Sequence, residues 1–203
     1  MARKTKQDTE QTRLAIMDSA LQTFYEKGFS RTTFDEIAKR INMTKGAVYW
    51  HFKNKTDVIV AIIKQKIAQS DSDTHQINTM EDLRNAIIKR AEHIEKDKKN
   101  KDFLFFMIYR MEWSEAVLNN VWEQIGSLCE IPDKKMYETL LRLQENGHIK
   151  KSIDITTLSE ILICFMRGCI NKYVSGKNNN MKLTTIMAQG FDAITDNAKA
   201  ENK

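Results

Sequence analysis

The stretch TTFDEIAKRINMTKGAVYWHFKNKTD, residues 32–57, decides the fold of the first part of the chain. Thr33 and Glu36 have the spacing of a capping box, and apolar residues follow at helical spacing. A tight turn at Asn42 comes next, and Thr44 then caps another short helix. Two short helices joined by a tight turn predict a helix-turn-helix.

The second of these helices carries unusual residues on its outer face. If Val48 points inward, a rotation of about 100° per residue makes Phe52 point inward too. Gly46, Tyr49 and Trp50 then point outward. Glycine costs about 1 kcal/mol relative to alanine inside a helix, a cost that makes sense if the backbone must approach another surface closely. Duplex DNA is such a surface.

The residues around this helix suit a nucleic-acid backbone. Lysine, tyrosine and histidine side chains, with the free N–H groups of capped helix starts, can donate to phosphate. Lys45 can donate to guanine edges, and Thr44 or Ala47 can meet a thymine methyl group. The alternatives are a surface Trp50 packed on a neighbouring helix and a solvated His51 at a helix end. The predicted DNA-binding residues are Thr33, Thr44, Lys45, Gly46, Ala47, Tyr49, Trp50, His51, Lys53 and Lys55.

Positive charge is concentrated in the same part of the chain. Residues 1–70 hold 13 Lys and Arg against 7 Asp and Glu, whereas residues 71–203 hold 19 against 20. The net charge of +5 therefore comes entirely from the first 70 residues. This asymmetry indicates a polyanion-binding unit on a near-neutral body, although a solvated lysine-rich surface would show a mild bias as well.

The composition predicts an all-α protein, because the chain has a single proline, seven glycines and few alternating strand-like runs. The polar stretch SDSDTHQINT, residues 70–79, is the candidate boundary between domains 1–70 and 71–203. The expected helices cover about residues 9–27, 34–41, 45–51, 55–69, 80–97, 101–113, 115–129, 133–146, 155–175 and 182–195.

Several other functions are not favoured by the sequence. The polar start MARKTKQDTEQTR is no signal peptide, and no run approaches the roughly 20 apolar residues of a membrane span, so we expect a cytoplasmic protein. Cys129, Cys164 and Cys169 lack metal-ligand spacing and are expected to be buried thiols. The four histidines have no catalytic partner at recognisable spacing, so neither an enzyme nor a cofactor is expected.

The stretch GFSRTTFDEIAKRINMTKGAVYWHFKNKTDV, residues 28–58, resembles the TetR/AcrR family of transcriptional regulators. It has a Gly-aromatic turn, a Thr-capped helix, a Thr-Lys-Gly-Ala helix start, a Tyr-Trp-His-Phe run and a lysine-rich start to the next helix. The shorter stretch MARKTKQ is similar to AcrR-like repressors of multidrug efflux operons. The resemblance implies a homodimer that binds a palindromic DNA operator and releases it when a small lipophilic ligand occupies the C-terminal domain.

The stretch DFLFFMIYRMEW, residues 102–113, predicts a buried helix because nearly every face is apolar. Methionines beside aromatic rings suit a permissive cavity, and Glu112 would suit a cationic drug-like ligand. Ordinary core is the alternative. The predicted ligand-binding residues are Phe103, Met107, Tyr109, Arg110, Met111, Glu112, Trp113 and Phe165.

The last two helices each carry an apolar seam, with Gly168 and Gly190 allowing close backbone approach. Such a pair completes the core of a monomer or forms half of a four-helix bundle across a two-fold axis. The family resemblance favours the dimer. The predicted interface residues are Leu158, Leu162, Phe165, Met166, Cys169, Tyr173, Leu183, Ile186, Met187, Gly190, Phe191 and Ile194.

Two functions of different classes thus remain. The leading one is a ligand-responsive repressor that reads a DNA sequence. The other is a helical interaction protein whose basic first part binds nucleic acid without sequence preference, which would show strong salt dependence and no discrimination among duplexes.

Overall fold

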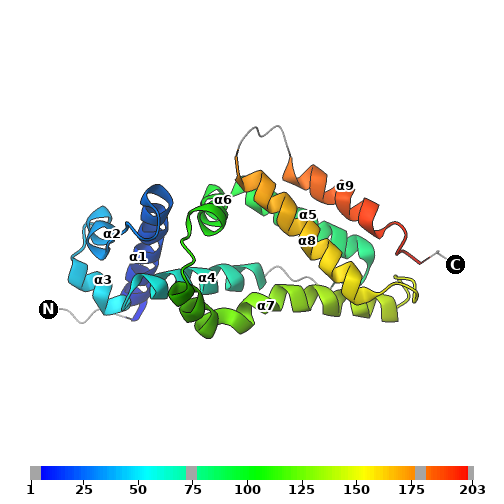
Figure 1. The fold of residues 1–203 in the computed structure, drawn as a ribbon, viewed down its shortest axis with the longest axis horizontal. Helices are drawn as coiled ribbons and strands as arrows, with labels where there is room; N and C mark the ends of the chain where they lie inside the picture. The colour runs from blue at the N-terminus through cyan, green and yellow to red at the C-terminus, as the bar shows by residue number, and fades with distance from the viewer. Residues whose placement is uncertain (1–5, 72–76, 177–181, 201–203) are drawn as a thin grey trace. The chain divides into compact units, whose positions relative to one another are not determined.

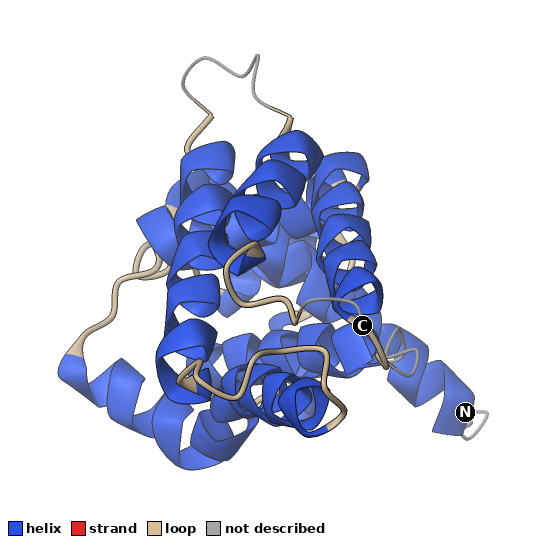
Figure 2. Cartoon of the chain, turned by 90° about the vertical axis from the view of Figure 1, so that its right-hand side faces the viewer, coloured by secondary structure: helices blue, strands red, loops and turns tan. Residues whose placement is uncertain are grey.

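The computed structural model describes residues 6–71, 77–176 and 182–200 (Figure 1). These residues form helices joined by loops, and no β-strand occurs among them (Figure 2). The only pairing of the β type in the described residues is an isolated antiparallel bridge between Ile149 and Lys199. The all-α prediction is confirmed.

The helices occur in the order that the sequence predicts, with two differences described below. Their bounds are α1 Lys6–Lys27, α2 Phe34–Arg40, α3 Lys45–His51, α4 Lys55–Asp71, α5 Met80–Lys96, α6 Lys98–Phe105, the π-helix η1 Phe106–Arg110, α7 Glu115–Glu145, α8 Ile155–Val174 and α9 Leu183–Thr195.

The first four helices, here called the head, pack around a shared apolar core. Phe24 of α1, Ile37 of α2 and Val48 of α3 are completely buried. Burying one such side chain contributes about 1.5–3 kcal/mol, which offsets the poor intrinsic stability of helices as short as α2 and α3. The turn between α2 and α3 is closed by Asn42, whose φ of 54° lies in the left-handed region that asparagine tolerates.

Contacts divide the described residues into two compact units. The first contains the head together with Phe103–Leu128, and the second contains the described residues of Ser72–Asp102 and Cys129–Lys203. In the first unit α1 packs against η1, where the rings of Phe24 and Phe106 stack with centroids 5.6 Å apart. The domain boundary near residue 70 stays a prediction.

The prediction of a single α-helix over residues 101–113 is wrong. The α-helix α6 ends at Phe105, the five-residue η1 follows, and Met111 is extended. The wider turn of a π-helix changes which residues share a face, so Ile108 and Tyr109 lie on the surface and are not buried as the apolar composition suggested.

The two predicted helices over 115–129 and 133–146 are in fact one, α7, which runs through Pro132. A proline inside a helix removes one hydrogen bond and costs about 3 kcal/mol, which is why the sequence favoured a break. The apolar residues Val121, Ile125, Leu140 and Leu143, two on each side of Pro132, are buried, and their packing offsets this cost.

In the second unit α9 packs against both α5 and α8. Arg84 of α5 donates from Nε and from a terminal nitrogen to the carboxylate of Asp192 of α9, at 2.8 and 3.0 Å. A Cβ at Gly190 of α9 would lie 2.0 Å from the Phe165 ring of α8, so Gly190 permits the close approach that the sequence predicts. At Gly168, in contrast, no atom of the described residues lies within 4 Å of an added Cβ, apart from the backbone of its own helix and its chain neighbours.

The prediction of buried thiols does not hold in the described part of α8. Cys164 is exposed, because it lies away from the face that carries the buried Leu158 and Leu162, and Cys169 is half-buried. The side chain of Cys129 lies outside the described residues.

Candidate nucleic-acid interface

Local capping positions the two helices of the predicted helix-turn-helix. The Thr33 hydroxyl accepts a hydrogen bond from the Glu36 N–H, and the Glu36 carboxylate accepts one from the Thr33 N–H at 2.9 Å, as the capping box predicts. The Thr44 hydroxyl likewise accepts from the Ala47 N–H at 3.2 Å and starts α3. Helix α3 therefore begins at Lys45 with its leading N–H groups fixed in direction.

The outer face of α3 is the one that the helical spacing predicts. Val48 and Phe52 are buried, whereas Tyr49 is 52% and Trp50 71% exposed. The Trp50 ring meets His51 of the same helix edge to face, with centroids 4.6 Å apart. An aromatic side chain this exposed is not packed on a neighbouring helix, so the alternative for Trp50 is not supported.

A surface hollow of about 370 Å³ lies where α2, α3 and α4 begin. It brings together five of the predicted DNA-binding residues and three others that the site prediction left out. The predicted five are Thr33, Lys45, Tyr49, Lys53 and Lys55, and the additional three are Thr32, Phe34 and Asn54. Thr44, Gly46, Ala47, Trp50 and His51 lie outside the hollow. Hydroxyl, ammonium and helix-start N–H groups around one depression are the donors that a phosphate group requires.

Aromatic packing holds the donors of this hollow in place. Tyr49 meets the Phe34 ring edge to face at 4.9 Å, and the Lys45 ammonium lies 5.6 Å from the centre of the Tyr49 ring. None of the ion pairs in the described residues involves Lys45 or Lys53. Both ammonium groups are therefore available to an external anion.

Lys55 has a role inside the head that the sequence did not indicate. Its ammonium donates to the carbonyl oxygens of Phe29 and Ser30 at 2.6 and 2.9 Å, and lies 4.8 Å above the Phe29 ring. Burial lowers the pKa of Lys55, against the carboxylates of Glu112 and Glu36, which favour the charged form. No local pattern could reveal contacts between residues this far apart in sequence. Its contact with phosphate stays a prediction.

The predicted ligand-binding residues are divided between the two units. Phe103 to Trp113 belong to the first unit and Phe165 to the second. Phe103 and Met111 are buried, Met107 and Phe165 are half-buried, and Tyr109, Arg110, Glu112 and Trp113 are exposed. Glu112 accepts a hydrogen bond from the Ser30 hydroxyl, so its carboxylate already has a partner. The ligand-binding role of these residues stays a prediction.

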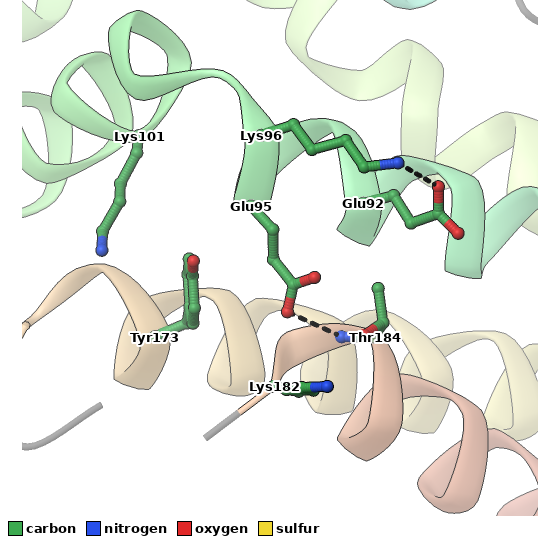
Figure 3. A pocket seen from close by; sticks show the side chains of 7 residues that line it. All are labelled: Glu92, Glu95, Lys96, Lys101, Tyr173, Lys182 and Thr184. Atoms are coloured by element: carbon green, nitrogen blue, oxygen red, sulfur yellow. Dashed lines mark hydrogen bonds and ion pairs between the residues drawn. The ribbon is translucent and has the colours of Figure 1, made fainter. Parts of the chain in front are cut away.

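A second hollow lies within the second unit and is lined by polar side chains (Figure 3). The Lys101 ammonium lies 4.6 Å from the centre of the Tyr173 ring, and Glu95 accepts from the N–H of Thr184 at the start of α9. The lining residues are Glu92, Glu95, Lys96, Lys101, Tyr173, Lys182 and Thr184. None of them was predicted to bind a ligand, and the mixed charge does not suit a lipophilic compound.

The predicted interface residues fall into two groups of six. Leu158, Leu162, Tyr173, Leu183, Met187 and Phe191 are buried within the single chain. Phe165, Met166, Cys169, Ile186, Gly190 and Ile194 are partly exposed. Ile161, which the sequence analysis did not select, is 47% exposed on α8. The interface prediction now depends on the second group and on Ile161.

The head also matches a known family. Residues 16–62 match the family model of bacterial regulatory proteins of the tetR family. This part of the chain is a tetR-family domain. The match covers the later part of α1, all of α2 and α3, and the first part of α4, and so includes the elements that build the hollow and the exposed face of α3.

The chain is also similar to named transcriptional regulators. The AcrR regulator of Shigella flexneri is 52% identical over 62 residues, which are 30% of this chain and 29% of that protein. The BepR repressor of Brucella suis is 26% identical over 208 residues, covering 95% of this chain and 89% of that protein. SmeT, the repressor of a Stenotrophomonas maltophilia multidrug efflux pump, has been solved with triclosan. That complex has a TM-score of 0.81 and 25% identity, covering 95% of this chain and 93% of that chain.

Two further observations concern other kinds of site. None of the described helices is long and apolar enough to cross a lipid bilayer. In the part of the chain that the structure describes, no three His, Cys, Asp or Glu side chains gather as metal ligands would.

Proposed function

We propose that this TetR-family chain is a ligand-responsive transcriptional repressor that binds double-stranded operator DNA as a homodimer. The main observation behind the proposal is that the exposed face of α3 lies beside a hollow lined by Lys45 and Lys53. Helix α3 would enter the major groove, and the hollow would receive a backbone phosphate.

The residues around α3 divide between two tasks. Lys45, Thr44 and Ala47 stand at the start of the helix, where they would meet base edges. Apart from the backbone of its own helix, a Cβ at Gly46 would meet only the Thr44 hydroxyl oxygen among the described residues, at 3.9 Å. The Gly46 backbone is therefore open to close approach. Phosphate contacts would come from Thr33, Tyr49, Trp50, His51, Lys53 and Lys55.

A homodimer would let two copies of α3 read successive major grooves, about 34–36 Å apart, in a palindromic operator. The partly exposed residues of α8 and α9 would form the interface. Operator DNA and a small ligand would then favour different separations of the two heads, so that each lowers the affinity for the other.

The solved structures of NalD and SmeT, both described as repressors of multidrug efflux pumps, support control of a multidrug efflux operon. The complex of SmeT with triclosan supports a small lipophilic effector, which we place in the C-terminal part of the chain as the family resemblance implies. The proposed protein acts in the cytoplasm, where operator DNA lies, and requires neither enzymatic activity nor a cofactor. Nucleic-acid binding without sequence preference is the alternative, and it is not favoured.

Release of DNA by an effector provides the test. A fluorescent duplex selected by the protein should be bound at near-physiological salt and released by lipophilic compounds, with triclosan as the first probe. The same compounds should raise the thermal midpoint of the free protein, because a ligand stabilises the state that it binds. If no member of a broad lipophilic panel releases the duplex or stabilises the protein, the proposed effector class is wrong.

A further inference from the structure

The loop that follows η1 contacts the turn between α1 and α2. The Ser30 hydroxyl in that turn donates to Oε2 of Glu112. A Cβ at Gly28 would lie 3.8 Å from Oε1 of the same carboxylate. Both residues belong to the first unit, although Ser30 and Glu112 are 82 positions apart in sequence.

Lys55 binds the same turn from the side of α4. Its ammonium donates to the carbonyl oxygens of Phe29 and Ser30. The negative charge of Glu112 favours the protonated form of Lys55 and so opposes the lowering of its pKa by burial. The turn is therefore held by a cation through its backbone and by an anion through the Ser30 side chain. Neither contact was expected, since Glu112 was assigned to a ligand and Lys55 to phosphate.

Aromatic packing fixes the Glu112 loop against α1. Phe106 stacks on Phe24 with ring centroids 5.6 Å apart, and Phe105 meets Tyr25 edge to face, also at 5.6 Å. The Phe106 ring is completely buried. A displacement of η1 would therefore move Glu112 relative to the turn or pull the turn with it.

The turn leads directly into the DNA-facing hollow. Thr32 and Thr33, which follow the turn, line the hollow, and so does Lys55. A change at Ser30 thus reaches the cap of α2 within three residues.

We propose that Glu112 is a positioning residue for DNA binding, which holds the α1–α2 turn through Ser30, while Lys55 holds the same turn from α4, and so sets the geometry of the hollow. The proposal rests on the proposed function, and it gives Glu112 a task other than contact with a cationic ligand. It also gives Lys55 a second role, in which Lys55 positions the turn beside the hollow through hydrogen bonds to Phe29 and Ser30.

The first test uses the free protein and needs no DNA. Amide hydrogen exchange in peptides covering residues 28–33 should be about 3- to 10-fold faster in Glu112→Ala than in the wild type, because a hydrogen bond to a charged group is lost. Ser30→Ala should have a similar effect, and the double variant should add little to either. Glu112→Gln keeps an acceptor for Ser30, so its exchange rate should lie between those of the wild type and Glu112→Ala. Glu123→Ala, which removes an exposed carboxylate elsewhere in the first unit, should match the wild type.

The second test measures affinity for a selected operator duplex. Glu112→Ala should weaken binding about 3- to 10-fold, while its thermal midpoint stays close to that of Glu123→Ala. Its effect should not add to that of Lys55→Ala, because both variants release the same turn.

The outcomes separate this proposal from the proposed function. Unchanged exchange at residues 28–33 in Glu112→Ala, or fully additive losses of affinity, would overturn the positioning role even if operator binding is specific. Altered exchange in a protein that discriminates no duplex would overturn the proposed function and, with it, any role of Glu112 in operator affinity.

Discussion

Glu36 illustrates how one side chain makes two contacts at the start of α2. It closes the capping box of α2 and accepts from the Lys27 ammonium at 2.6 Å. The hydrogen bond from Lys27, followed by that from the Thr33 N–H, lowers the pKa of Glu36 from 4.5 to about 2. The sequence indicated the capping box, because its partners are three residues apart, but no local pattern pointed to Lys27.

Glu36→Gln should therefore change the pH dependence of stability. Because the pKa is lower in the folded chain, ionised Glu36 stabilises the fold above its unfolded value, and this contribution is lost as pH falls from 4.5 to about 2. Urea midpoints should show the variant less stable than the wild type at neutral pH, with a gap that closes in acid. A gap of constant size down to pH 2 would mean that the contacts of Glu36 do not depend on its charge.

At the scale of elements, the sequence predicted α2, α3, α5, α8 and α9 within about two residues because their starts and stops are local. Asp154, for example, accepts from the N–H groups of Thr156 and Thr157 and starts α8. The errors at η1 and Pro132 arise because these two features do not depend on local sequence. A π-turn packed on Phe24 and a proline flanked by buried apolar residues are decided by contacts distant in sequence, which no local pattern contains.

Thr44→Ala should show how much α3 depends on its cap. Loss of the hydrogen bond to the Ala47 N–H should cost about 0.5–2 kcal/mol of stability, measured by urea unfolding, and should weaken operator binding. Thr44→Ser keeps the hydroxyl and should restore most of the stability. If the serine variant is as unstable as the alanine variant, the cap does not explain the role of Thr44.

At the scale of the whole molecule, the sequence predicted the fold class and the exposed face of α3, but it did not predict which residues of the body lie together. The exposed face of α3 follows from the helical repeat, and the starts of α2 and α3 follow from the caps at Thr33 and Thr44. The predicted ligand residues, in contrast, are divided between two units, and Glu112 binds Ser30. Apolar composition alone does not show whether a residue lies in the core, lines a cavity or forms an interface. For this reason half of the predicted interface residues are in fact buried within the single chain.

The proposed dimer predicts the effect of a charge on the outer face of α8. Wild-type protein should have twice the chain mass of 23.6 kDa in light scattering. Ile161→Arg should give a monomer with much weaker operator binding, because a buried unpaired charge is costly in an interface. Leu118→Arg, at a similarly exposed position of α7, should remain dimeric. A dimer that survives Ile161→Arg would remove this face of α8 from the interface.

The central claim is that α3 reads a DNA sequence, and selection of duplexes from a random pool tests it most directly. The wild type should select a palindrome, and Lys53→Ala should select the same palindrome with lower affinity, because phosphate contacts carry no sequence information. Lys45→Ala should lose preference at one base pair in each half-site. A wild-type protein that binds duplexes without any consensus would contradict the claim.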